Sequence, residues 1–129
     1  MKPEPHSRTY DPTPSPLWKA ILTDEYEIAD YIETFASDYV DNDLLVDYFR
    51  GTRAVLRLIP IDGLKPGDPD ANLRDASKER RYAKLPSESM PPLVIRNREI
   101  EDGNHRFRVA QKRGEKALWC YAVEDRPHS

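Results

Sequence analysis

The chain has few cysteines and no long apolar run, and each absence excludes a class of protein. Its 129 residues include one cysteine, Cys120. A single cysteine rules out an intramolecular disulfide framework and a zinc site made of several cysteines. No window approaches the roughly 18 consecutive apolar residues that a membrane-spanning helix needs. Residues 1–16 contain no apolar core of the kind found in secretory signals, so we expect a cytoplasmic protein without a membrane partner.

Positive charge is not in excess either. The formal net charge is -3 at pH 7, which argues against broad electrostatic attraction to nucleic acid. A local basic surface is still compatible with this balance. The length supports one domain with a single small core. Cys120 is expected in the wall of that core because it lies in the strand-like run 118–123.

Composition divides the chain into three parts. Residues 1–17 hold five of the 12 prolines, which remove backbone donors, so we predict an extended arm. Residues 18–52 are predicted as a helical extension with two helices. Thr23 is expected to cap the first helix, and Gly51 to end the second, over 43–50, in a left-handed conformation. The side chains expected to face inward are Ile28, Tyr31, Ile32 and Phe35 in the first helix, and Leu45, Tyr48 and Phe49 in the second.

Acidic side chains are concentrated in this helical extension. They are Glu25, Glu27, Asp30, Glu33, Asp38, Asp41 and Asp43. Such a run is either a solvated surface, or a surface that repels DNA or mimics it for a protein partner.

Residues 53–126 are predicted to form a small α+β domain. Residues 54–61 are rich in β-branched and aliphatic side chains, which is typical of a first strand. A helix is expected over 72–85, and it is the most basic segment of the chain. Its basic residues are Arg74, Lys78, Arg80, Arg81 and Lys84. They either face solvent or contact a nucleic acid or nucleotide.

The second half of this domain places a polar loop between a strand and a helix. The strand at 93–95 is followed by an expected hairpin turn at 96–98 and a strand at 99–101. A helix over 106–113, closed by Gly114, comes next, and a final strand completes the order. This order predicts a small mixed sheet with packed helices.

The polar loop, from Asp102 to His105, has the properties of an anion site. Gly103 lets the backbone approach a ligand closely, and the N–H groups of a first helical turn attract negative charge. Arg106 can add a bidentate grip on phosphate.

The sequence DGNHRFRVA, residues 102–110, resembles the phosphate-binding box of the ParB/sulfiredoxin superfamily. ParB members carry a GERR-type box, and Gly103 and Arg106 match its glycine and its phosphate arginine. The match continues to Ala110. Free-serine kinases of the superfamily use a DGHHR-like box. Sulfiredoxins carry their catalytic cysteine at the position of Asn104, so the resemblance does not imply the sulfiredoxin reaction.

The resemblance implies a ParB/sulfiredoxin-like fold over 53–126. Such a domain would bind a nucleoside triphosphate such as CTP or ATP with Mg²⁺, or another phosphorylated small molecule. The later Glu-Asn-type motif and the helix-turn-helix region of ParB do not follow the box, so a short stand-alone member is expected. Such a short, acidic domain resembles those that plasmids and phages encode.

The candidates for phosphate binding are Gly103, Asn104, His105, Arg106 and Arg108. Arg106 either grips phosphate or forms a salt bridge with Glu99 or Asp102. Asn104 either supplies an amide donor or caps the helix beside it. Arg108 lies on a different face of the expected helix from Arg106.

The candidates for catalysis are Asp102, His105 and Glu101. Asp102 either coordinates Mg²⁺ at a phosphate, acts as a general base toward a hydroxyl, or makes an ordinary turn before glycine. His105 either donates to phosphate, shuttles a proton, or is structural. Glu101 and Glu99 are alternate residues of one strand and form a candidate carboxylate pair.

Three functions from different classes follow. The first is a nucleotide- or phosphate-binding enzyme, such as an NTPase or a small phosphotransferase. The second is a non-catalytic inhibitor of the plasmid or phage type that binds a protein through the acidic helices. The third is a DNA-binding or nuclease accessory, which the basic helix favours. The net charge disfavours it, as does the absence of a ligand pattern for two metals.

Overall fold

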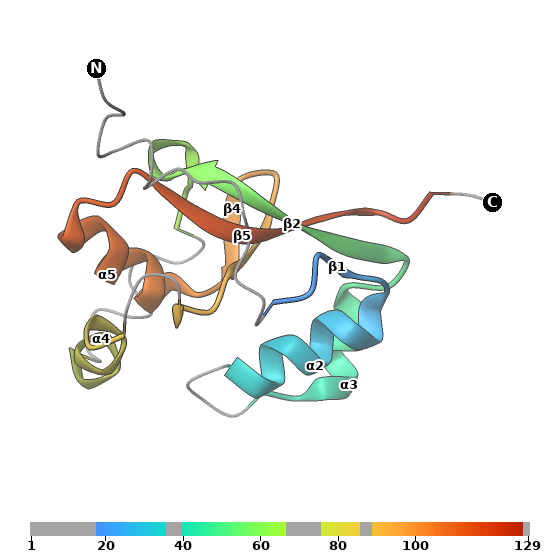
Figure 1. The fold of residues 1–129 in the computed structure, drawn as a ribbon. Helices are drawn as coiled ribbons and strands as arrows, with labels where there is room; N and C mark the ends of the chain where they lie inside the picture. Colours follow the sequence, from blue (N-terminus) through green and yellow to red (C-terminus); the bar gives the residue numbers. More distant parts are fainter. Residues whose placement is uncertain (1–17, 36–39, 67–75, 86–88, 128–129) are drawn as a thin grey trace, which may run out of the picture.

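A computed structural model of the chain describes residues 18–35, 40–66, 76–85 and 89–127. The predicted arm over 1–17 lies outside these residues. The described chain forms a five-stranded mixed sheet with helices packed on it, which confirms the expected α+β class (Figure 1). The strands are β1 (Ile21–Leu22), β2 (Thr52–Pro60), β3 (Leu93–Arg96), β4 (Glu99–Asp102) and β5 (Ala117–Asp125). The helices are α2 (Glu25–Phe35), α3 (Asn42–Tyr48), α4 (Ala76–Ala83) and α5 (Asn104–Arg113), with a 3₁₀ turn η1 (Ile61–Gly63).

β5 lies at the centre of the sheet, whose order is β1-β2-β5-β3-β4. It pairs antiparallel with the whole of β2, from Thr52 opposite Asp125 to Pro60 opposite Ala117. On its other side it pairs in parallel with β3. β3 and β4 form an antiparallel hairpin. β5 therefore joins β2 to the hairpin that leads into the polar loop.

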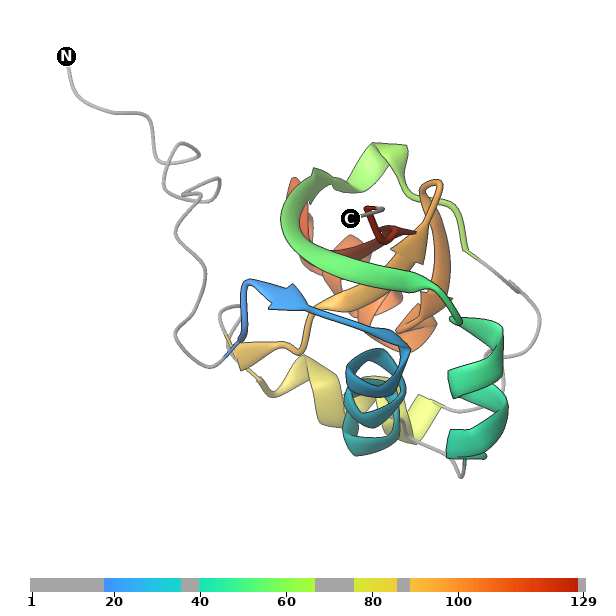
Figure 2. The ribbon, with the colours of Figure 1, turned by 90° about the vertical axis from the view of Figure 1, so that its right-hand side faces the viewer.

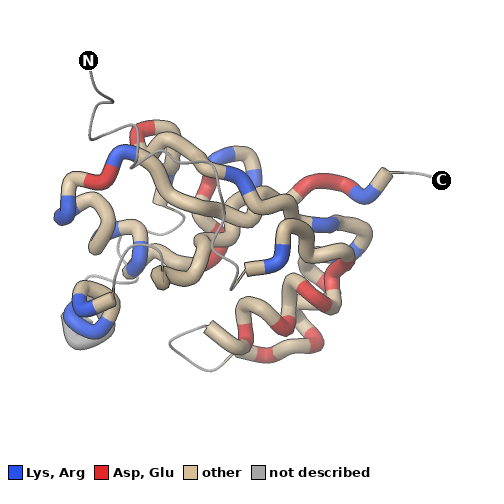
Figure 3. Tube along the Cα trace, in the orientation of Figure 1, with Lys and Arg blue, Asp and Glu red and all other residues tan. Residues whose placement is uncertain are grey.

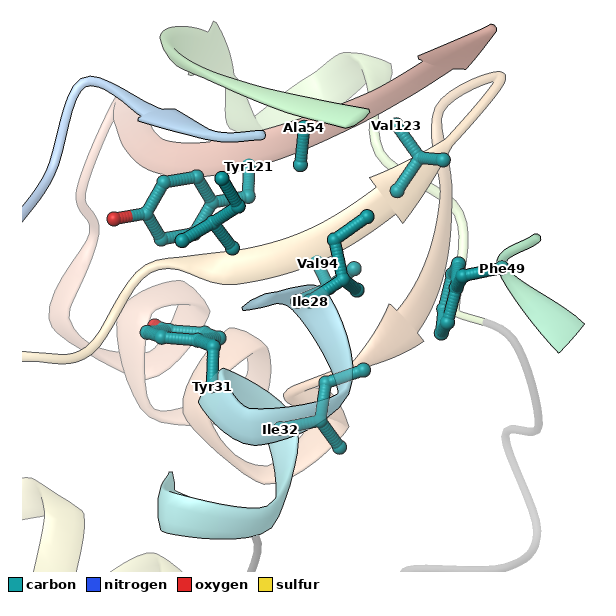
Figure 4. Packing of buried hydrophobic residues seen from close by; sticks show 9 residues of the cluster. Ile28, Tyr31, Ile32, Phe49, Ala54, Val94, Tyr121 and Val123 are labelled. Carbon is teal, nitrogen blue, oxygen red and sulfur yellow. The ribbon is translucent and has the colours of Figure 1, made fainter. Parts of the chain in front are cut away.

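Alternate residues of the central strands enter two apolar clusters, as the two-residue period of a strand requires. Val94 and Tyr121 belong to the first cluster, together with Ile28 of α2. Figure 4 shows these side chains meeting between the helix and the sheet. Leu93, the neighbour of Val94, belongs to the second cluster, together with Phe107 of α5. The sheet thus carries α2 on one cluster and α5 on the other.

The first helix buries the side chains that its periodicity predicts, and Phe35 packs against the same cluster. The predicted cap, Thr23, is wrong. Asp24 caps α2 instead, because its Oδ1 atom accepts hydrogen bonds from the backbone N–H groups of Tyr26 (3.1 Å) and Glu27 (3.0 Å). Thr23 donates its own N–H to Glu27 Oε1 at 2.9 Å. Two donors at the helix start are satisfied by one aspartate.

The predicted helical extension shares its core with the domain that follows it. β1 pairs antiparallel with β2, and the rings of Tyr31 and Tyr121 meet edge to face with centroids 4.8 Å apart. α2 and α3 lie side by side on one side of the sheet (Figures 1 and 2). Residues 18–52 therefore help to stabilise the sheet that carries the polar loop.

The second helix runs over Asn42–Tyr48 instead of the predicted 43–50, and one of its expected inward side chains is exposed. Asp41 caps it, Phe49 is buried and Leu45 is half-buried. Tyr48 was expected to face inward, but it is 56% exposed. The reason is that its hydroxyl donates to the carboxylate of Glu101 at the surface, at 2.8 Å from Oε2. Gly51 has the expected left-handed conformation, with φ +80°, but it does not end the helix, which stops at Tyr48 with Phe49 as its C-cap.

The β3–β4 hairpin contains the predicted turn and an unpredicted bulge. Asn97 and Arg98 have φ of +53° and +68°, the combination typical of a two-residue type I′ turn. Further along, Ile95 pairs with Ile100 but Val94 pairs with Asp102. Glu101 is therefore the extra residue of the bulge, and the bulge shifts the end of β4 by one residue.

α5 begins earlier than the prediction of 106–113 and ends as predicted. Its first residue is Asn104, and it closes at Gly114 with φ +74°. Cys120 is fully buried, as expected. The predicted basic helix appears as α4. Residues 72–75, including Arg74, and the side chain of Lys78 lie outside what the structure describes. No helix in the described ranges is both long enough and apolar enough to cross a membrane.

Candidate site at the β4–α5 junction

The polar loop lies where β4 ends and α5 begins. Asp102 is the last residue of β4, and Gly103 is the N-cap of α5 with φ +110°. A Cβ atom at Gly103 would lie 2.5 Å from Leu93 Cδ2 and 3.0 Å from Arg106 Nη2. Both the backbone conformation and the close packing therefore require glycine. Glycine has no side chain with which to cap the N–H groups of the first turn.

Arg106 is the most deeply placed charged residue of the loop region, with 2% of its side chain exposed. Its Nη1 atom donates to the backbone oxygens of Pro91 (3.0 Å) and Pro92 (3.2 Å). Its Nη2 atom donates to Asp102 Oδ2 at 2.7 Å. Arg106 thus binds the entry of β3 and the exit of β4 at once. Of the two roles that the sequence allows for Arg106, a phosphate ligand or a salt bridge, the structure contains the salt bridge with Asp102.

Two tyrosines complete the surroundings of the Arg106 guanidinium. Tyr31 of α2 donates its hydroxyl to Pro92 O at 2.5 Å, and the ring of Tyr82 on α4 lies 5.9 Å from the guanidinium carbon. Burial acts to lower the pKa of Arg106, but the charge of Asp102 and the two tyrosines outweigh it, so the pKa is raised. The guanidinium is therefore a permanent buried cation, as arginine normally is.

The remaining box residues divide by their exposure. His105 is buried with Phe107, Val109 and Ala110, whereas Asn104 and Arg108 are half-buried. Asn104 and Arg108 are four residues apart and therefore share one face of α5. Helical side chains lean toward the N-terminus, so Arg108 leans back toward the start of α5. The sequence predicts that Arg108 and Arg106 lie on different faces of the helix. The structure agrees, because Arg106 is buried whereas Arg108 is half-buried.

The two candidate carboxylates, Glu101 and Asp102, have separate partners. Asp102 turns to Arg106, while both Glu101 oxygens accept from the Tyr48 hydroxyl, at 3.0 and 2.8 Å. The hydrogen bond to Glu101 raises the pKa of Tyr48. Arg96 Nε lies 3.7 Å from Glu101 Oε2. Glu101 therefore contacts Tyr48 of α3 and Arg96, although it directly precedes Asp102 in the sequence.

Basic side chains lie on α4 and directly after it, and α4 packs against α5. Arg80, Arg81 and Lys84 are exposed, and Figure 3 shows positive charge on α4 and α5 and negative charge on α2 and α3. Arg113 fixes α4 beside α5, since its Nη2 donates to the backbone oxygens of Tyr82 (3.2 Å), Ala83 (2.8 Å) and Leu85. Sequence reasoning missed this role of Arg113, and its one signal is a basic residue at the end of a helix.

Among the residues that the structure describes, no three histidine, cysteine, aspartate or glutamate side chains are grouped closely enough to hold a metal. Mg²⁺ often binds through one or two carboxylates together with the phosphates of its substrate, and Asp102 is the carboxylate at the loop. In comparisons with known proteins, no protein-family model, curated protein or solved structure matches this chain.

Proposed function

We propose that this protein binds the phosphate groups of a nucleotide at the start of α5. The observation that carries the proposal is Gly103, a left-handed N-cap that has no side chain to cover the first turn. The N–H groups of a first turn, together with the helix dipole, favour an anion at that position. The DGNHRFRVA sequence supports the proposal independently, since it resembles the phosphate-binding box of the ParB/sulfiredoxin superfamily.

In this proposal the two arginines of the box have different roles, one structural and one in phosphate binding. Arg106 is occupied by Pro91, Pro92 and Asp102, so its role is to fix the backbone around Gly103. Arg108 is half-buried and shares a face with Asn104 at the helix start. Arg108 and Asn104 are therefore the side chains that would reach a phosphate on the first turn.

A magnesium nucleotide is the ligand class that we propose. Asp102 is 20% exposed on its side chain and would supply a carboxylate to Mg²⁺ beside the phosphates. Bound Mg²⁺ would neutralise phosphate charge during transfer or hydrolysis. His105, the buried second residue of α5, is the remaining candidate for a hydrogen bond to phosphate. NTPase or phosphotransferase activity is the corresponding proposal for catalysis.

The test is a calorimetric titration of the full chain with CTP, ATP and GTP in the presence of Mg²⁺. Asn104→Asp is the informative variant, because a carboxylate in the first turn favours the helix by about 0.3–1 kcal/mol but repels phosphate. Gln111→Glu, an exposed position near the other end of α5, is the matched control with the same charge change. We expect Asn104→Asp to weaken binding about tenfold or more and Gln111→Glu to leave it unchanged.

Arg108→Gln provides a second variant, which removes the proposed phosphate cation. It should also weaken binding, and raising the salt concentration should weaken wild-type binding toward the level of this variant. Absence of saturable binding to all three nucleotides, or equal loss in Asn104→Asp and Gln111→Glu, would contradict the proposal.

A further inference from the structure

The surface between α3 and β4 presents apolar side chains that the fold leaves uncovered. Among the described residues, the large apolar side chains that are exposed are Ile21, Tyr26, Leu44 and Tyr48. Leu44 is 66% exposed and Tyr48 is 56% exposed, and they lie one helical turn apart on α3. Residues four apart share one face of a helix. Leu44 and Tyr48 therefore form a continuous apolar stripe, which we call the α3 stripe.

The ring of Tyr48 is held in place before any partner arrives. Its hydroxyl donates to Glu101, and the Arg96 guanidinium carbon lies 5.2 Å from its centroid. The Phe49 ring packs edge-on against it at 4.8 Å. A side chain that is already ordered loses little entropy when it is covered, and tyrosines fixed in this way are frequent binding anchors. Covering the α3 stripe with a partner would therefore cost little side-chain entropy at Tyr48.

Carboxylates border the α3 stripe on both sides. Asp43 and Asp47 follow it along α3, and both are exposed. Glu99 and Glu101 border it from β4, and the charge of both acts on the Tyr48 hydroxyl. Arg50 pairs with Asp47, but among the described residues neither Asp43 nor Glu99 has an ion-pair partner. A ligand on this stripe would therefore meet the carboxylates of Asp43 and Glu99, whereas Asp47 is paired with Arg50 and Glu101 with Arg96.

We propose that the α3 stripe docks a basic amphipathic segment of another protein. An apolar side chain of that segment would cover Leu44 and Tyr48, and its lysine or arginine side chains would pair with Asp43 and Glu99. Nucleic acid and anionic lipid surfaces would be repelled by the same carboxylates. This surface is separate from the β4–α5 loop, so the proposal does not depend on phosphate binding.

A second copy of the chain fits this surface less well than a basic partner does. Two copies meeting through the same surface would bring the Asp43 and Glu99 carboxylates of both copies into one interface. The basic surface on α4 and α5 has the right charge, but none of the exposed large apolar residues of the described chain lies on it. It therefore offers nothing to cover Leu44.

The test uses a fluorescein-labelled amphipathic helical peptide of leucine and lysine as the probe, with fluorescence anisotropy at about 0.15 M salt. A peptide of the same composition in scrambled order, which has no apolar face, is the control ligand. We expect the amphipathic peptide to bind the full chain, and Leu44→Ser to weaken binding roughly tenfold. Asp43→Asn combined with Glu99→Gln should weaken it and flatten its salt dependence.

Tyr26→Ser is the matched control, because Tyr26 is 57% exposed on α2 and lies outside the stripe. The proposal is overturned if the amphipathic peptide does not bind, if the scrambled peptide binds equally, or if Tyr26→Ser reduces binding as much as Leu44→Ser. Sedimentation of the protein without peptide measures whether two copies of the chain form a dimer. A dimer that Leu44→Ser dissociates would assign the stripe to self-association and overturn the basic partner.

Discussion

Replacing Arg106 by methionine should destabilise the fold strongly, because the change removes a buried cation but keeps much of the side-chain length. Three hydrogen bonds are lost, to Pro91, Pro92 and Asp102. Pro92 keeps the hydroxyl of Tyr31 as a donor, so the oxygen of Pro91 and the carboxylate of Asp102 bear the loss. The cost is therefore that of a broken buried ion pair with one buried acceptor left without its donor.

The magnitude follows from these partners. Breaking a buried ion pair on one side typically costs about 3–5 kcal/mol. Asp102 is 20% exposed and can regain some water, which places Arg106→Met near the lower end, at about 3 kcal/mol. Because small domains have a free energy of unfolding of only about 5–15 kcal/mol, the effect is large. With a urea slope of about 1–3 kcal/mol per molar, the midpoint should fall by about 1–3 M.

Urea denaturation followed by circular dichroism measures this shift, with the double variant Arg106→Met, Asp102→Asn as the control. Removing the unpaired carboxylate should recover part of the lost stability, because a neutral amide is less costly to leave near the core than a charge. A midpoint that moves by less than about 0.3 M at an unchanged slope would refute the structural role of Arg106. It would return the residue to the ligand role that its sequence match suggests.

Three further predictions concern single groups. The N–H of Glu25 itself, that of Gly51 and the charge of Arg126 hold the pKa of Glu25 below its usual 4.5. Its stabilising effect is therefore present above pH 4.5 and is lost as the pH falls through the folded value. Glu25→Gln should flatten the dependence of the free energy of unfolding on pH in that range, measured by denaturation at several pH values. Burial raises the pKa of Cys120 to about 12, so a disulfide reagent at pH 8 should react with it only after urea is added, and reaction in the native state would contradict its burial. Arg98 has φ +68°, so Arg98→Gly should stabilise the hairpin by roughly 0.5–1 kcal/mol in thermal denaturation. A lower melting temperature would show that the side chain contributes more than the turn conformation costs.

Local patterns in the sequence predicted the elements around the loop well. Gly114 as a helix end and Asn97 in a hairpin turn follow from backbone conformations that few residues adopt. The apolar face of α2 follows from its 3.6-residue period. These predictions succeeded because each depends on neighbours in the sequence.

The cap at Asp24 was a local miss, but the larger features that sequence reasoning missed depend on contacts between distant segments. Tyr48 has the right position to face inward, but Glu101, 53 residues away, holds it at the surface. For Arg106 the sequence left open a phosphate ligand or a salt bridge with Glu99 or Asp102, but it gave no sign that the carbonyls of two prolines outside the box are also acceptors. Charged side chains are rarely buried unless they are paired, and no local pattern announces such a pair.

The central position of β5 has a consequence for how the protein is made. β5 follows every other described strand in the chain, yet β2 and β3 depend on it for their pairing. During synthesis, the ribosome therefore releases both strands with unpaired edges before their common partner exists. Such contacts between distant residues slow folding and prolong the time in which strand edges can pair with other chains. For a nascent chain of this protein, the hazardous interval ends only when residues 117–125 have emerged.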